Sequence, residues 1–300
     1  MYRIKRDQIV YEMSALNKPV LHVEEGATVI FETCDCFEDQ IKSADTQFEA
    51  LDWNRINPAT GPVYVENAEP GDVLEVNIKQ IKIAEQGVML TGPQLGMLGD
   101  RLTQNVIRQI PIRNNKAVYN DRVEIPLKPM IGVIGTAPMG DAVACGTPGE
   151  HGGNMDCTII GEGTILYLPV NVPGALLAMG DLHAVMGDGE VSVCGLEVSG
   201  EVTVTISVIK DRQLPVPFAK TASSVYVISS AKTLDEAVLN ATRKLVGLLT
   251  TLTNHRVNDY DAVNLLSLTG NLQICQVVDP LKTVRFELKS AYLDQLGITI

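Results

Sequence analysis

The chain has 300 residues and a formal net charge of −12, with a sequence pI of about 4.8. This acidic balance argues against a nucleic-acid partner or an anionic membrane surface, because phosphate contacts need a surplus of Lys and Arg. Hydrophobic residues make up 45% of the chain and aromatic residues only 5%. Such a composition argues against disorder and predicts an aliphatic core rich in strands.

The first 14 residues contain no apolar segment of the kind found in secretory signals. No apolar run reaches the roughly 18 residues of a membrane span. We therefore expect a cytoplasmic protein whose six cysteines are reduced thiols. Cys34 and Cys36 have no matching C-x-x-C elsewhere, so a structural zinc site built from four cysteines is not expected.

Alternating and β-branched residues predict strands through most of the first 210 residues. Asp35 follows the first clear strand, where it either lines a pocket or caps the next turn. Residues 37–51 are expected to hold no more than a helical turn. The Gly- and Met-rich stretch 87–105 predicts either a surface loop or a flexible loop over a pocket. The expected strands cover 29–33, 63–65, 73–80, 106–110, 116–119, 125–134 and 164–172, with two more inside 190–206.

The composition shifts at 210–217, and we place a boundary there between a β-rich unit, residues 1–210, and an α/β unit, residues 211–300. In the second unit Thr233 and Glu236 form a capping-box pattern, which is followed by apolar residues at helical spacing. The remaining expected elements are a helix from about 259 to the stop glycine Gly270 and strands at 225–228, 272–278 and 284–288.

Residues 146–190 carry two of the four histidines, each among glycines and carboxylates. Asp181 and His183 are two residues apart, so an extended backbone turns both to one side, and Asp188 with Glu190 repeats that spacing. Neutral imidazole and carboxylate are the usual ligands of zinc and similar divalent metals. The structural alternative is that Gly-Asp dipeptides form ordinary turns and that a single histidine only packs. The combination of both clusters favours a metal or catalytic site.

Hydrolysis of an acyl group needs a polarised carbonyl, an activated water and a proton donor. A divalent metal held by His and Asp supplies the first two, and Glu190 or Glu150 is available as a base. A nitrilase-type site would need a cysteine nucleophile. Cys157 is a poor candidate, because the neighbouring Asp156 carboxylate would raise the pKa of its thiol.

Several segments together resemble the acetamidase/formamidase family. They are HVEEGATVIFETCDCF, NPATGPVYVENAEPGDVLEVNI, ACGTPGEHGGNMDC, LYLPVNVPGALLAMGDLHAVMGDGEVSVCGLEVSGEVTVTI and NLLSLTGNLQICQVVDP. The resemblance implies hydrolysis of short-chain amides such as formamide or acetamide to carboxylate and ammonia. It also implies a mostly β fold resembling a jelly-roll sandwich with a smaller C-terminal α/β part, a divalent metal such as zinc or calcium, and a homodimer. The family's motifs fall on Asp35, His151, Gly152, Gly153, Asn154, Asp156, Asp181, His183, Asp188 and Glu190.

The sequence therefore predicts one small cavity with a divalent metal, zinc before calcium. Glu190 is expected as general base, Asn154 as a carbonyl-polarising donor and Glu150 as a further acid-base group. The alternative is a non-catalytic β-sandwich that binds a small ligand or a metal. The expected metal ligands are Asp35, His151, Asp156, Asp181 and His183.

Overall fold

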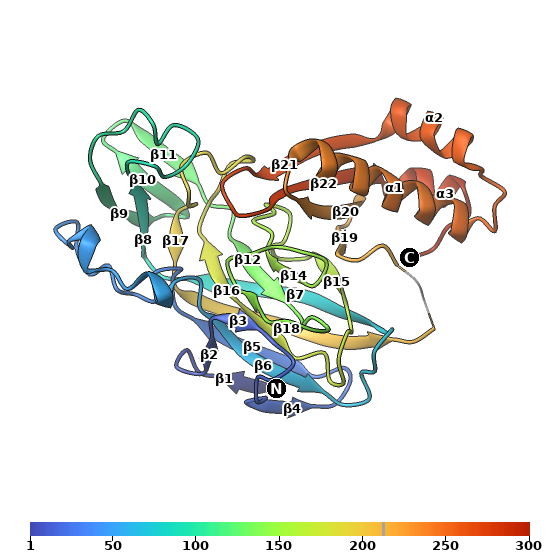
Figure 1. The fold of residues 1–300 in the computed structure, drawn as a ribbon, viewed down its shortest axis with the longest axis horizontal. Helices are drawn as coiled ribbons and strands as arrows, with labels where there is room; N and C mark the ends of the chain where they lie inside the picture. The colour runs from blue at the N-terminus through green and yellow to red at the C-terminus, as the bar shows by residue number, and fades with distance from the viewer. Residues whose placement is uncertain (212–213) are drawn as a thin grey trace.

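The structure is a computed structural model that describes residues 1–211 and 214–300. It is mostly β, and its α-helices follow residue 233 (Figure 1). The expected β-rich fold with a C-terminal helical part is thus confirmed. Arg212 and Gln213, which belong to the expected boundary segment, lie outside the described residues. None of the described helices has the length and apolar character needed to cross a bilayer.

A nine-stranded sheet runs through the described chain from the N-terminal to the C-terminal part. In its interior strand β18 the side chains of Val202, Val204 and Ile206 are buried, while Thr203 and Thr205 between them are partly exposed. This alternation is what one covered face of a sheet requires. The strands in spatial order are β1 (Tyr2–Ile4), β5 (Thr28–Thr33), β18 (Gly200–Ile209), β7 (Val73–Ile83), β15 (Ile165–Pro169), β19 (Phe218–Lys220), β20 (Ser224–Ala231), β22 (Lys282–Lys289) and β21 (Asn271–Gln276).

A second, eleven-stranded sheet packs against the first, with small strands beside it. Its hairpin β9–β10 turns at Asn114 and Asn115, which both have a positive φ, a conformation that asparagine adopts readily in tight hairpin turns. The path is β11 (Val123–Pro126), β10 (Lys116–Asn120), β9 (Val106–Arg113), β8 (Gln86–Thr91), β17 (Glu197–Val198), β16 (Leu177–His183), β12 (Met130–Gly135) and β14 (Gly152–Asn154); β6 (Ala59–Val65) pairs with β16, β2 (Ile9–Val10) and β4 (Leu21–Val23), and β13 (Val143–Ala144) pairs with β3 (Glu12–Met13).

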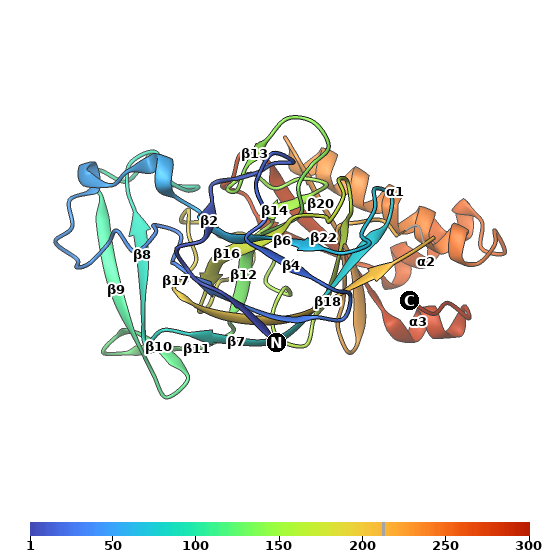
Figure 2. The ribbon, with the colours of Figure 1, turned by 90° about the horizontal axis from the view of Figure 1, so that it is seen from below.

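The main core lies between these two sheets. Phe31 and Ile78 point into it from the first sheet and Ile131 and Leu182 from the second, and all four are at most 1% exposed. Burial of each such side chain stabilises the fold by about 1.5–3 kcal/mol. Strands β8 to β11 extend beyond this core at one end of the molecule, and the helices lie at the other end (Figure 2).

The helices α1 (Leu234–Leu252), α2 (Asp259–Thr269) and α3 (Ser290–Gln295) pack on the C-terminal end of the nine-stranded sheet. Strand β20 serves both cores, because Val225 and Val227 face the helices while Tyr226 and Ile228 face the main core. The predicted helix start is confirmed: the Thr233 side chain accepts a hydrogen bond from the backbone N–H of Glu236. The two units expected on either side of residue 210 therefore share one sheet, and the division between them stays a prediction.

The strand expected over residues 190–196 is wrong. Glu190 and Val193 have φ values of 45° and 120°, and Val191 is 67% exposed. Regular strand begins only at Glu197. The alternation of apolar residues here arises from a loop that turns some side chains into a cavity, which a period of two cannot distinguish from a strand.

Candidate active site

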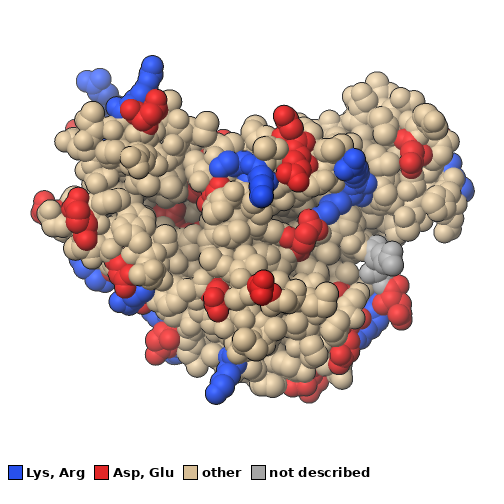
Figure 3. All heavy atoms as spheres, viewed as in Figure 1, with Lys and Arg blue, Asp and Glu red and all other residues tan. Residues whose placement is uncertain are grey.

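A cavity of about 470 Å³ opens beside strand β16. Figure 3 shows acidic atoms inside a hollow on this face of the molecule. The walls combine the end of β16, loops after β5 and β8, and the loop before β22. Its lining residues are Tyr11, Cys36, Phe37, Trp53, Asn54, Ile56, Asn57, Leu90, Leu95, Ala144, Gly146, Thr147, Asn154, Asp181, His183, Glu190, Val193, Cys194, Glu197, Val278, Asp279 and Pro280.

Three carboxylates surround the imidazole of His183. Its Nε2 atom lies 3.0 Å from Oε1 of Glu197, 3.4 Å from Oδ1 of Asp181 and 3.7 Å from Oδ1 of Asp156. Glu197 reaches this point because it stands directly opposite His183 in the pairing of β16 with β17. All four side chains are at most 3% exposed. The sequence placed Asp156, Asp181 and His183 together, and the structure brings these three into one cluster.

Glycine makes room for this cluster. A Cβ atom at Gly132 would lie 2.5 Å from Oδ1 of Asp156 and 2.7 Å from Oδ2 of Asp181. A Cβ atom at Gly195 would lie 2.6 Å from Nδ1 of His183. Real Cβ atoms do not approach other groups so closely, so both positions must lack a side chain for the carboxylates and the imidazole to meet.

The charges of the cluster shift one another. Burial alone would lower the pKa of His183, but Glu197 and Asp181 raise it well above its usual range. Burial raises the pKa values of Asp156 and Glu197 well above the usual carboxyl range. The pKa of Asp181 is lowered, because His183 outweighs the effect of burial. Such opposed shifts in one cavity are typical of functional groups.

The donor set fits a divalent metal. Asp156 Oδ1, Asp181 Oδ1 and Glu197 Oε2 are buried atoms without a hydrogen-bond partner among the described residues. A buried polar atom left in this state costs about 1–3 kcal/mol, and more when it is charged. Ligand atoms of Cys36, Asp181 and Glu197 lie within 4.8 Å of one another, as do those of Asp156, His183 and Glu190. Nitrogen, oxygen and sulfur donors together suit zinc, whereas calcium prefers oxygen alone.

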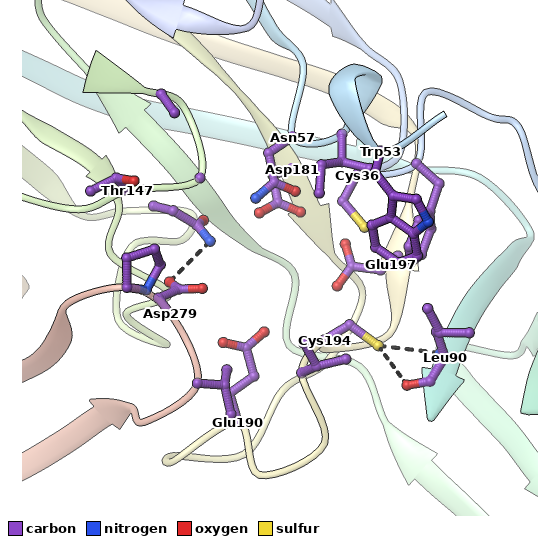
Figure 4. Close-up of a pocket in the computed structure, with 18 of the residues that line it drawn as sticks. Cys36, Trp53, Asn57, Leu90, Thr147, Asp181, Glu190, Cys194, Glu197 and Asp279 are labelled. Carbon is purple, nitrogen blue, oxygen red and sulfur yellow. Dashed lines mark hydrogen bonds between the residues drawn. The ribbon is translucent and has the colours of Figure 1, made fainter. Parts of the chain in front are cut away.

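Glu190 and Asp279 face the same cavity from two different loops (Figure 4). Burial, and then the nearby Asp156 carboxyl, raises the pKa of Glu190 to about 9. The side-chain amide of Asn154 donates to Oδ2 of Asp279 at 3.1 Å. Its own Oδ1 atom is buried without a partner in the described part of the chain. Glu190 and Asn154 thus lie where the sequence placed them, in one cavity with His183.

Four of the expected site residues lie outside the lining of this cavity, and of these only Asp156 reaches the cluster around His183. Oδ1 of Asp35 accepts hydrogen bonds from the backbone N–H groups of Phe37 and Asp39 at 3.0 and 2.7 Å, which is the capping alternative. Glu150 is exposed and accepts a hydrogen bond from Nζ of Lys244 at 2.6 Å. Neither side chain reaches the cluster around His183 in this structure.

His151 also lies outside the cavity lining. Its side chain is buried, its Nε2 has no hydrogen-bond partner among the described residues, and burial lowers its pKa to about 4. Asp188, whose spacing to Glu190 suggested a common side, instead binds the guanidinium of Arg285 and accepts from Thr158. Glu190 has a positive φ, so the extended backbone assumed for this pair is absent.

Cys157 is not positioned to act as a nucleophile in the cavity. Its thiol is fully buried and lies 3.4 Å from Sγ of Cys275, and it is not part of the cavity lining. Sequence reasoning did not single out Cys36, Glu197 or Asp279. Of these three residues, Glu197 carries the clearest signal in the sequence, because it is an acidic residue among apolar ones. An acidic side chain in such a position is rarely buried without a partner.

The chain is similar in sequence and structure to known acetamidases and formamidases. The crystal structure of an acetamidase from Bacillus halodurans is 47% identical, with a TM-score of 0.97, over 99% of this chain and 100% of the other. That of a predicted acetamidase/formamidase from Thermoanaerobacter tengcongensis is also 47% identical, with a TM-score of 0.97, over 100% and 99% of the two chains.

A more distant relative, the acetamidase of Mycolicibacterium smegmatis, is 25% identical in an alignment 254 residues long, with a coverage of 63% of this chain and 63% of the relative. The chain spans less than two thirds of the length of the curated relatives it matches. The family model for acetamidases and formamidases matches residues 17–145 and 140–239. This chain therefore belongs to the acetamidase/formamidase family.

Proposed function

We propose that this protein hydrolyses primary amides to carboxylate and ammonia with the help of a divalent metal, and zinc is the first candidate for that metal. Asp156, Asp181, His183 and Glu197 would hold the ion. The observation that supports this assignment is the placement of His183 Nε2 within 3.0–3.7 Å of three carboxylates that keep unpartnered oxygens. Family membership supplies the amide as the substrate class.

Asp156, Asp181, His183 and Glu197 would hold the ion, which would supply polarisation of an amide carbonyl and a bound water with a pKa near neutrality. The chain's own residues position the ligand side chains and exclude bulk water. Gly132 and Gly195 leave space for the ligand side chains, and the buried walls keep bulk water away from them. Low local dielectric strengthens each of these charge interactions.

Glu190 is the proposed proton carrier. Its carboxyl faces the cavity, and burial together with the nearby Asp156 carboxyl raises its pKa to about 9. A protonated carboxyl can donate to the leaving nitrogen, which an amide requires before the carbon–nitrogen bond breaks. The sequence suggested Glu190 as the base, and its environment in the structure favours the donor role.

Asn154 and Asp279 are the proposed positioning pair. The Asn154 amide is held by Asp279, so its orientation is fixed before a substrate enters. An amide substrate has both donor and acceptor groups, and the unpartnered Asn154 Oδ1 is an acceptor for its N–H. Because Asp279 comes from the C-terminal loop before β22, both parts of the chain contribute to the site.

The test combines metal analysis with ammonia release. We expect the purified protein to contain at least about one zinc ion per chain and to release ammonia from acetamide. Ammonia release should stop after treatment with a chelator. Asp181→Asn should lose metal and activity together. Glu150→Gln is the matched control, since it makes the same chemical change at an exposed carboxylate outside the cavity. Full activity in the chelated protein would contradict the proposal, and metal binding without ammonia release from any amide would support the non-catalytic alternative.

A homodimer is also proposed. An uncovered apolar loop would favour such an interface, but Val88 and Leu90 in the apolar segment 88–90 are at most 5% exposed. The loop that follows β8 is more open: Met97 is 56% exposed and Leu98 60% exposed. Light scattering should give twice the chain mass of 32.5 kDa.

A reducing compartment such as the cytoplasm stays a proposal that rests on the six free cysteines.

A further inference from the structure

The cavity has two unlike walls. The carboxylates of Asp181, Glu190, Glu197 and Asp279 form one of them, the carboxylate wall, and apolar side chains form the other, the apolar wall. In Figure 4 Trp53 lies on the side of Cys36 and Leu90, away from Asp279 and Glu190. The apolar side chains of the second wall are Phe37, Trp53, Ile56, Leu90, Leu95 and Val193. Neither hydrolysis nor metal binding requires this wall.

The apolar wall is the surface of a separate small core. Phe37 and Leu90 are buried in it, and Ile56, Leu95 and Val193 pack against it. Trp53 is 40% exposed at the rim, where its ring lies 5.0 Å from that of Phe48, centroid to centroid. The short 3-10 helix η2 (Trp53–Arg55) that carries it is capped by the side chain of Asp52, which accepts from the backbone N–H of Asn54. The wall is therefore formed before a substrate binds.

The volume of the cavity is much larger than acetamide needs. An engineered apolar cavity of about 150 Å³ holds a benzene molecule, and one water occupies about 30 Å³ of liquid. The cavity measures about 470 Å³. Pockets of about 300–1,000 Å³ are the size that encloses drug-sized ligands. A two-carbon amide would leave the apolar wall in contact with water.

We propose that the physiological substrates are primary amides whose acyl part carries an apolar group of about the size of an aromatic ring, seated against Trp53. This inference rests on the proposed amidase function. The amide nitrogen faces the carboxylate wall, because Asp181, Glu190 and Glu197 offer carboxyl groups that exchange hydrogen bonds and protons with it. The acyl substituent then points to the apolar wall. The reaction adds one water across the carbon–nitrogen bond, R–CO–NH2 + H2O, and yields R–COO⁻ and NH4⁺.

The experiment compares kcat/KM for ammonia release from acetamide and from phenylacetamide. We expect the wild-type protein to favour phenylacetamide by at least about 10-fold, which is about 1.4 kcal/mol of added transition-state binding. Trp53→Ala should remove most of this preference and leave acetamide within about twofold. Trp53→Phe should retain the preference. Tyr260→Ala, an aromatic deletion at an 84% exposed position on α2, should change neither substrate.

The outcomes separate this inference from the proposed function. No ammonia from any amide, in a protein with full metal content, would overturn the amidase function itself. Hydrolysis of acetamide without a preference for phenylacetamide would overturn only the substrate inference. Equal losses for both substrates in Trp53→Ala would show a structural role for Trp53. Faster release of benzylamine from N-benzylacetamide than of ammonia from phenylacetamide would place the apolar group on nitrogen and reject the acyl assignment.

Discussion

The Nε2 atom of His183 lies 3.0 Å from Oε1 of Glu197, because these residues stand opposite each other in neighbouring strands. One residue is a ligand expected from the sequence, and the other was not expected. We predict that Glu197→Gln lowers metal content and reduces kcat/KM for acetamide by at least about 100-fold. Loss of a group that only orients a ligand already costs about 10–100-fold in metal affinity, and Glu197 is a proposed ligand itself.

The fold should survive this change, since Gln has the size of Glu and adds no buried charge. Metal content by elemental analysis, ammonia release and circular dichroism are the measurements. Glu124→Gln, at an exposed surface ion pair with Lys116, is the control and should behave as wild type. A Glu197→Gln protein with wild-type metal content and turnover would remove Glu197 from the site.

Gly132→Ala is predicted to damage the site through space alone. The added methyl group would meet Oδ1 of Asp156 at 2.5 Å and Oδ2 of Asp181 at 2.7 Å, so one carboxylate has to move. We expect loss of metal and activity, with a decrease of about 1–3 kcal/mol in the free energy of unfolding.

The matched control is Gly247→Ala. Gly247 is exposed within α1, and no described atom outside its chain neighbours and the nearby backbone of this helix lies within 4 Å of the added Cβ. Because Gly weakens a helix interior, this change should stabilise the protein by about 0.5–1 kcal/mol and leave activity unchanged. Urea denaturation followed by ammonia assays measures both effects. The steric explanation fails if Gly132→Ala binds metal as tightly as Gly247→Ala does.

Much of the fold could be predicted because its signals are local. The β-branched run in β5, the alternation in β7 and β18, and the capping box of α1 each depend on neighbouring residues. The family assignment from the sequence motifs is also confirmed. What local patterns could not show is that β19 pairs with β15, which joins the two halves of the chain in one sheet.

The candidate site was predictable only in part, for the same reason. Asp181 and His183 are close in sequence, so their common side followed from spacing. Glu197 and Cys36 join them through strand pairing and loop folding over long sequence distances. Asp35 and Glu150 also carry carboxylates that could bind a metal. In the structure Asp35 accepts hydrogen bonds from the backbone of a turn, and Glu150 pairs with Lys244. Spacing identifies residues that can bind a metal, and tertiary contacts decide which of them meet.

The ion pair between Arg285 and Asp188 should stabilise the loop that carries Glu190. Two nitrogens of the Arg285 guanidinium donate to Asp188 at 2.6 and 2.9 Å, and the arginine side chain is only 5% exposed. Asp188→Asn leaves this buried charge without its partner, so we expect a loss of about 2–3 kcal/mol in the free energy of unfolding.

The double variant Asp188→Asn/Arg285→Met removes the unpaired charge as well. It should be more stable than Asp188→Asn alone, because an apolar side chain replaces the buried cation. Chemical denaturation of the two single variants and the double variant measures the coupling. Additive losses would show that the two side chains do not stabilise each other.

Acid should weaken the C-terminal sheet through Glu287. Burial alone would raise its pKa, but hydrogen bonds from Lys289, Ser224 and Asn271 lower it to about 2. The folded protein therefore holds Glu287 ionised at pH values where the unfolded chain already binds a proton. The stability that comes from this group is fully present above the ordinary glutamate pKa of about 4.5 and is lost as the pH falls through 4.5 towards 2.

Glu287→Gln removes that pH dependence. It should be less stable than wild type at pH 7, because the Lys289 ammonium loses its 2.6 Å partner and Gln presents a donor where two side-chain amides donate. The difference between the urea midpoints of the wild-type protein and of Glu287→Gln should become smaller from pH 5 to pH 3. Ser224→Ala, which removes one donor at 2.7 Å, should show a smaller effect in the same direction. A gap that stays constant from pH 7 to pH 3 would show that the charge of Glu287 does not contribute to folding stability.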